Sequence, residues 1–157
     1  MIEPKKEFME AAIEEAMKTK ERGDYSVGAV VVKNGEILAK SGNRIKLDND
    51  PTYHAEIVAI REAAKILGKR HLEDCILYAT HEPCPMCTSA AVWAKMKGIV
   101  FGARIEDMQE FRTRNGNKIW SWRTIDIPAS AIIVKGNPKL ILVGDFMREQ
   151  CKKLFHS

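Results

Sequence analysis

Two short apolar runs, at residues 76–80 and 99–103, flank a segment with a helical pattern at 85–96. Each apolar run has the length of a buried strand, and the segment between them is long enough for a helix. A strand, a helix and a second strand in this order form a right-handed crossover, which makes the strands parallel and places the helix on one face of the sheet. The alternation therefore predicts an α/β fold.

Other patterns extend this sheet and cover it. Residues 27–33 and 36–40 are β-rich runs joined by Asn34-Gly35, which predicts an antiparallel hairpin. A helical pattern at 55–67 ends at Gly68, and an amphipathic one covers residues 4–22. We expect the helices at 55–67 and 85–96 on one face and the N-terminal helix on the other. The result is a three-layer α/β/α fold with a central mixed five-stranded sheet flanked by helices.

The C-terminal third has weaker signals. Residues 104–130 are polar and basic without periodicity, so we expect a long loop there. Residues 131–135 are expected to form the fifth strand, and residues 140–155 a strand end followed by a helix. A chain of 157 residues that is 45% hydrophobic fits one domain, residues 1–157.

Charge and hydropathy exclude some classes of protein. The N-terminus has no apolar segment behind its charges, and no apolar run approaches the roughly 20 residues of a membrane span. We therefore expect a soluble, cytoplasmic protein without a membrane partner. The chain has 25 Lys and Arg against 21 Asp and Glu, a net charge of +4. This charge is modest for a dedicated nucleic-acid binder.

Two motifs carry the metal-binding residues: His54-Ala55-Glu56 and, thirty positions after the histidine, Cys84-Pro85-Met86-Cys87. Two cysteines three positions apart at the start of a helix have their sulfurs on one face. The adjacent helices should bring their N-termini together, which places His54 beside the two sulfurs. Three protein ligands leave the fourth position of a zinc ion open, as in catalytic sites.

Glu56 lies two residues after His54 and begins the apolar stripe of its helix. Its carboxylate should face inward beside the metal, where burial hinders ionisation. This placement suits a group that takes a proton from an activated water and passes it to a substrate.

The alternative is a non-catalytic site, in which the cysteines form a structural zinc knuckle or a redox pair and the chain is a zinc-stabilised interaction module. A structural site normally has a fourth protein ligand, and no other His or Cys has the expected paired spacing. An unliganded carboxylate such as Glu56 has no use in such a site.

His-x-Glu followed by Pro-Cys-x-x-Cys is the signature of zinc deaminases. With Asn43, Asp50–Glu56, Glu82–Cys87 and Phe101–Ala103, the chain resembles the cytidine deaminase-like superfamily, in the branch with guanine, fungal-type cytosine and tRNA adenosine deaminases. The resemblance implies Zn2+ bound by His54, Cys84 and Cys87, and Glu56 as the catalytic proton shuttle. It also implies that Asn43 and the backbone around Ala55 and Cys84 bind the base, and that the protein is a homodimer or larger.

The sequence departs from the pattern of that branch at three places. Ser26 stands where many relatives have proline, and His81 stands where threonine or serine is common. His81 is either a loop residue or a group that touches the substrate. After Asp107 neither the guanine-type nor the tRNA-type C-terminal pattern is present.

These observations favour hydrolytic deamination of a free nucleobase or nucleoside, of the guanine or cytosine type, with tRNA-specific adenosine deamination as the alternative. Trp120 and Trp122 lie among basic residues, which suits either single-stranded nucleic acid or a solvated loop whose tryptophans pack on the core. We expect this aromatic C-terminal part, with Phe146 and Phe155, to close the pocket.

Overall fold

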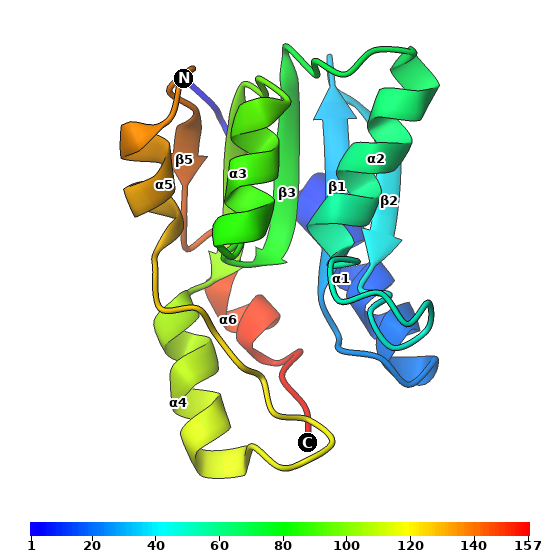
Figure 1. Cartoon of the computed structure of the whole chain (residues 1–157), viewed down its shortest axis with the longest axis vertical. Coiled ribbons are helices and arrows are strands. Elements are labelled where there is room, and N and C mark those ends of the chain that lie inside the picture. Colours follow the sequence, from blue (N-terminus) through cyan, green and yellow to red (C-terminus); the bar gives the residue numbers. More distant parts are fainter.

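A five-stranded sheet in the order β2-β1-β3-β4-β5 forms the centre of the molecule in the computed structural model, which describes residues 1–157 (Figure 1). The elements in chain order are α1 Lys6–Glu21, β1 Gly28–Lys33, β2 Glu36–Gly42, α2 Ala55–Leu67, β3 Cys75–His81, α3 Pro85–Trp93, β4 Gly98–Ala103, α4 Ile105–Asn115, α5 Ala129–Lys135, β5 Ile141–Val143 and α6 Arg148–Lys152. The predicted α/β class and the mixed five-stranded sheet are confirmed.

Strand β1 runs antiparallel to both of its neighbours, whereas β3, β4 and β5 are parallel. The Asn34-Gly35 turn joins β1 to β2 with both residues at positive φ, as a two-residue hairpin requires. Strands β2, β3 and β4 consequently run in the same direction, and the loops that follow them meet at one end of the sheet. This end carries the candidate site.

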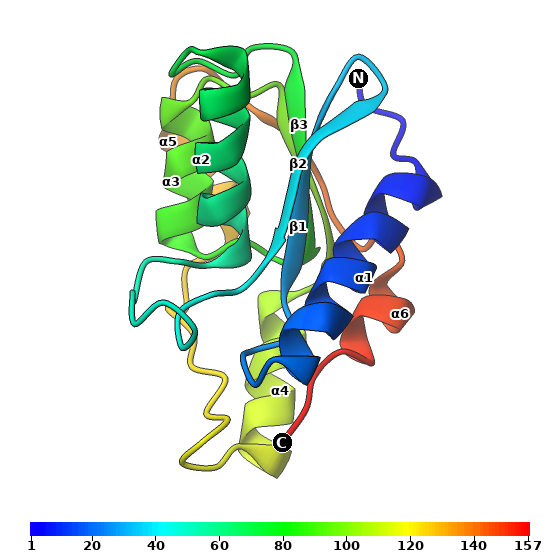
Figure 2. The ribbon, with the colours of Figure 1, turned by 90° about the vertical axis from the view of Figure 1, so that its right-hand side faces the viewer.

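Helices α2, α3 and α5 cover one face of the sheet, and α1 and α6 cover the other (Figure 2). Alternate residues of the strands face the two layers. Leu77 and Ile99 pack under α2 and α3, whereas Tyr78 and Val100 pack under α1 and α6. All four are almost fully buried, so the sheet separates two apolar cores.

The helix predicted at 55–67 is confirmed to the residue, and Gly68 ends it in the left-handed conformation at φ 67°. The helix predicted at 85–96 ends at Trp93 instead. None of the helices combines the length and the apolar character needed to cross a bilayer.

The prediction of a long loop over residues 104–130 is wrong for its first part, which forms α4. The carboxylate of Asp107 accepts the N–H of Arg104, 2.8 Å away, at the start of this helix. Met108 and Phe111 then pack against the core under α1 and α6, which includes Phe155. The packing contacts of Met108 and Phe111 come from distant parts of the chain, so the local sequence pattern does not show them.

The prediction of a strand at 131–135 is also wrong, because Ala129–Lys135 is the helix α5. The run Ile132-Ile133-Val134 has high β propensity, but the carboxylate of Glu82 accepts the N–H of Ala129 at the start of the helix, 2.9 Å away. The fifth strand is instead β5, which pairs with β4. A strand followed by a helix in residues 140–155 is confirmed, although both elements are short.

Candidate active site

Two helix N-termini and the ends of two strands meet at the lower end of the sheet in Figure 1. His54 is the N-cap residue of α2, and Cys84 is the N-cap residue of α3. Neither side chain caps its helix by a hydrogen bond, so both remain free to bind a ligand. Pro85 begins α3 and Cys87 follows in its first turn.

The three expected metal ligands are brought together by this arrangement. His54 Nδ1 lies 3.6 Å from Cys84 Sγ and 3.5 Å from Cys87 Sγ. Two ligands about 2.1 and 2.3 Å from one tetrahedral ion stand about 3.6 Å apart, which is the separation expected for a histidine nitrogen and a thiolate on zinc. The three ligand atoms all lie within 4.8 Å of one another. The donor set and its dimensions therefore fit a zinc ion with one open position.

The two cysteines differ in their pKa. The hydrogen bond with Cys87 lowers the pKa of the Cys84 thiol, and the same bond raises the pKa of Cys87 well above its usual value. Cys84 is thus a thiolate at neutral pH, which is the form that binds a metal ion.

Glu56 faces inward from the first turn of α2 and is only 3% exposed. Burial raises the pKa of its carboxyl group to about 7. Its Oε1 atom has no hydrogen-bond partner in the protein. A buried carboxyl group that titrates near neutrality and has a free oxygen beside the metal ligands can both accept and donate a proton.

A pocket of about 390 Å³ opens beside these residues. Asn43, Ala55, Glu56 and Cys84 line one side of it, so the expected substrate-binding residues and the expected catalytic residue share one cavity. The Oδ1 atom of Asn43 accepts the N–H of Ile45 at 3.4 Å, which leaves the amide nitrogen as a free donor.

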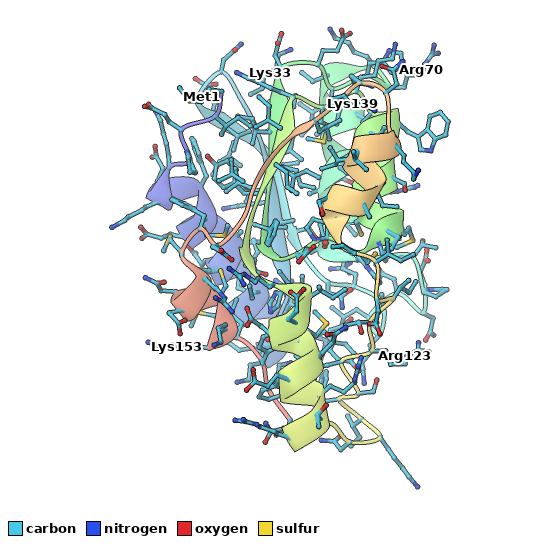
Figure 3. All side chains as sticks on the ribbon, turned by 90° about the vertical axis from the view of Figure 1, so that its left-hand side faces the viewer. Met1, Lys33, Arg70, Arg123, Lys139 and Lys153 are labelled. Carbon is cyan, nitrogen blue, oxygen red and sulfur yellow. The ribbon has the colours of Figure 1, made fainter.

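The opposite side of the pocket comes from the C-terminal third of the chain, at residues 105, 108 and 121–125. Figure 3 labels Arg123 on this segment, at the end of the sheet opposite Lys33. Trp122 is buried there, and its Nε1–H donates to the carbonyl of His156 at 2.6 Å. The last residues of the chain therefore hold the segment that lines the pocket.

Tyr25 also holds this segment, although nothing in its local sequence indicates such a role. Its hydroxyl accepts the N–H of Ser121 at 3.0 Å, and its ring packs edge-on against both Trp120 and Trp122. Its partners lie about 96 positions away in the chain.

Glu82 is a second residue whose role the sequence pattern does not show. Its Oε1 accepts the N–H of Ile105 at 3.0 Å, and its Oε2 accepts the N–H of Ala129 at 2.9 Å. One carboxylate thus fixes both ends of residues 105–129 to the loop that carries Cys84.

Arg112 and Trp122 of this segment are engaged inside the protein, whereas Arg114, Lys118 and Arg123 are exposed. Arg112 donates to the hydroxyl of Thr124 at 2.8 Å, and Arg114 pairs with Glu110 at 3.1 Å. Trp122 is buried, so it offers no exposed platform for a base of RNA.

The positions of the two remaining cysteines agree with a packing role. Cys75 and Cys151 are fully buried in the apolar cores, one on each side of the sheet.

A mixed sheet with one histidine, two cysteines and an unliganded glutamate at adjoining helix N-termini defines a zinc-binding deaminase domain. The chain belongs to the family described as the cytidine and deoxycytidylate deaminase zinc-binding region, whose profile matches residues 2–103. The predicted superfamily is therefore confirmed.

The relatives of this chain include two kinds of deaminase. It is 51% identical over 83 residues to guanine deaminase of Bacillus subtilis, which is 53% of each chain. It is 43% identical over 99 residues to tRNA-specific adenosine deaminase of Aquifex aeolicus, which is 63% of this chain and 66% of that one. The chain thus matches between about half and two thirds of the length of these relatives.

A solved structure from a study of A-to-I editing by tRNA:A34 deaminases matches with a TM-score of 0.76 at 29% identity. The match covers 96% of this chain and all of the other. The comparisons establish the zinc deaminase family, and relatives of both kinds occur, so the substrate has to be inferred from the pocket.

Proposed function

We propose that this protein is a zinc-dependent hydrolytic deaminase of a free nucleobase or nucleoside, of the guanine or cytosine type. The observation that carries the proposal is a single pocket with His54, Cys84 and Glu56 on one side and the protein's own C-terminal segment on the other, with Cys87 completing the ligand set behind Cys84 and His54. A concave pocket of this size, lined by apolar side chains together with polar groups such as Asn43, suits a small ring.

Each residue has a defined task in this reaction. Zinc, when held by His54, Cys84 and Cys87, would supply a water that is activated near neutral pH. Glu56 accepts one proton from this water and delivers it to the ring nitrogen. It then accepts the remaining hydroxyl proton and delivers it to the departing amine. Asn43 orients the base through its amide nitrogen, and the backbone at Ala55 and Cys84 borders the reacting carbon. The amine and water become a carbonyl and ammonia.

Relatives named as tRNA-specific adenosine deaminases make a tRNA anticodon loop the second candidate substrate. We favour the small substrate because residues 121–125, which the C-terminus holds in place, form a wall of the pocket, whereas a flipped-out nucleotide needs an open approach for its strand. The hydrogen bond between Arg112 and Thr124 supports the same choice, because it engages this basic residue within the protein.

Ammonia release by the zinc-loaded full chain tests the proposal. The panel contains free bases, nucleosides, nucleotides and a tRNA anticodon stem-loop. We expect turnover on at least one base or nucleoside, at least tenfold above that on the stem-loop. Turnover on the stem-loop at least tenfold above that on every base and nucleoside would indicate a tRNA deaminase instead. The absence of ammonia release from all substrates would favour the non-catalytic zinc module.

We also propose that the protein is a homodimer or larger, with a second copy on the outer side of α2, α3 and α5. Each of these helices exposes a large apolar side chain, Ile66, Trp93 and Val134 respectively, and Trp93 is 82% exposed. Large apolar side chains that are exposed on neighbouring helices are typical of an interface. Sedimentation at micromolar concentration should show an oligomer that Trp93→Glu dissociates, and a monomeric wild-type protein would contradict this.

A further inference from the structure

His81 is a polar residue of the pocket to which the proposed reaction assigns no task. It ends β3, is 2% exposed, and lines the same pocket as Glu56 and Asn43. Its Nε2 atom has no hydrogen-bond partner, although a buried polar atom without a partner is costly. A ligand in the pocket is a natural source of the missing partner.

The hydrogen bonds of Thr80 determine which nitrogen of His81 carries the proton. The N–H of Gly28 donates to Thr80 Oγ1 at 3.1 Å, and His81 Nδ1 lies 2.7 Å from the same oxygen. A peptide N–H can only donate, so the hydroxyl proton of Thr80 has Nδ1 as its remaining acceptor. Nδ1 then accepts a hydrogen bond, and the proton of the neutral ring is on Nε2.

The ring of His81 is held in place from two sides. Trp122 stacks on it with ring centroids 5.9 Å apart, and Phe155 contacts it edge-on at 4.7 Å. Burial lowers the pKa of His81 to about 3, so the ring is neutral at physiological pH. The polar group that this fixed ring can offer to the pocket is therefore a single N–H donor.

Ser26 and the C-terminus contribute to the surroundings of His81. The hydroxyl of Ser26 donates to the carbonyl of Leu154, and the N–H of Ser26 donates to His156 at 3.3 Å. The carbonyl of His156 in turn accepts the Nε1–H of Trp122, which stacks on His81. Ser26 therefore helps to fix the C-terminal residues that hold this ring.

We propose that His81 is a specificity-determining residue, whose Nε2–H donates a hydrogen bond to a carbonyl oxygen of the base. The proposal rests on the proposed deaminase function and narrows its substrate to amine-bearing bases with a ring carbonyl, such as guanine and cytosine. Adenine has no carbonyl group. A base without this acceptor leaves the buried donor unpaired, and the protein should therefore discriminate against it.

Matched substrates and matched variants test this inference. Guanine and 2-aminopurine differ at the carbonyl and at the ring N–H beside it, as do cytosine and 4-aminopyrimidine, so the effect of the carbonyl is read from the change in this difference between the wild-type protein and the variants. Asparagine at position 81 can keep the contact with Thr80 but removes the distal donor, whereas glutamine places an amide nitrogen near the position of Nε2. The proteins are the zinc-loaded full chain, His81→Asn and His81→Gln, with zinc content and thermal unfolding measured for each.

We expect the wild-type protein to prefer the carbonyl-bearing member of a pair. His81→Asn should lower kcat/KM for that member by roughly 10- to 100-fold and leave the other within about threefold. His81→Gln should restore most of the loss. A merely structural role predicts equal losses on both members, and this outcome, or no loss on either, would overturn the proposal.

Equilibrium dialysis of the same pairs separates this inference from the proposed function. Selective binding of the carbonyl-bearing base, lost in His81→Asn, would support the role of His81 even without ammonia release, and the proposed reaction alone would then fail. The protein could instead convert adenosine substrates and neither bind nor convert a carbonyl-bearing base. That result would overturn the role of His81, although the protein would still be a deaminase. A protein that neither binds nor converts any member would contradict both.

Discussion

Residues 2–103 and residues 104–157 build opposite sides of one pocket in different ways. The first region supplies His54, Glu56, Cys84 and Cys87 from two motifs at helix starts, and the family profile matches it. The second region supplies Trp122 and its neighbours, which are held by contacts up to about 130 positions away in the chain. The metal ligands and Glu56 thus lie in short local motifs of the first region. The shape of the pocket, in contrast, depends on long-range contacts of the second region.

Loss of a metal ligand should have the largest effect, because it removes the function of the first region entirely. Cys87→Ala leaves two ligands, so we expect zinc to be lost and activity to fall by more than about 10⁴-fold, with some loss of stability since metal binding is coupled to folding. Elemental analysis and ammonia release measure both. Cys75→Ala is the control, because Cys75 is buried away from the pocket and should leave zinc in place.

Glu56→Gln should separate metal binding from catalysis within the first region. The amide keeps the shape of the side chain but cannot accept the proton, so we expect full zinc content and a loss of about 10²- to 10⁴-fold in kcat. Near wild-type turnover would show that another group carries the proton.

Trp122→Phe tests the second region. Phenylalanine keeps an aromatic ring beside His81 but loses the hydrogen bond to the carbonyl of His156. We expect a roughly 3- to 10-fold rise in KM with unchanged zinc content, because the side of the pocket is loosened while the metal ligands are untouched. Trp93→Phe is the matched control at an exposed tryptophan outside the pocket. An unchanged KM in Trp122→Phe would show that this hydrogen bond of the C-terminal region does not contribute to substrate binding.

The smallest expected effect is a pH dependence of stability caused by His81, where the two regions meet. Its pKa is about 3 in the folded protein and about 6.5 when unfolded, so the unfolded state binds more protons between these values. The free energy of unfolding therefore decreases as the pH falls through this window, by about 0.8 kcal/mol between pH 8 and pH 6. His81→Asn should lose this contribution in urea unfolding at the two pH values. Identical pH dependence in both proteins would contradict the buried neutral ring.

The sequence was sufficient for elements whose signals are local. The Asn34-Gly35 hairpin, the helix that ends at Gly68 and the crossover at residues 76–103 each depend on neighbouring residues, and each was predicted. The spacing of the metal ligands within two motifs predicted their convergence for the same reason. The predictions are wrong where contacts with distant residues determine the local structure. One example is the start of α5, where the carboxylate of Glu82 accepts the N–H of Ala129.

The sequence by itself determined the α/β class, the zinc ligands and the position of Glu56 on its helix, because helix periodicity and motif spacing restrict these geometrically. Only the tertiary structure decided that residues 105–115 are helical, that Trp122 borders the pocket and that the buried Nε2 atom of His81 has no partner in the protein. Each of these features depends on hydrogen bonds and ring contacts between segments far apart in the chain, and such pairings are not apparent in the linear pattern of one sequence.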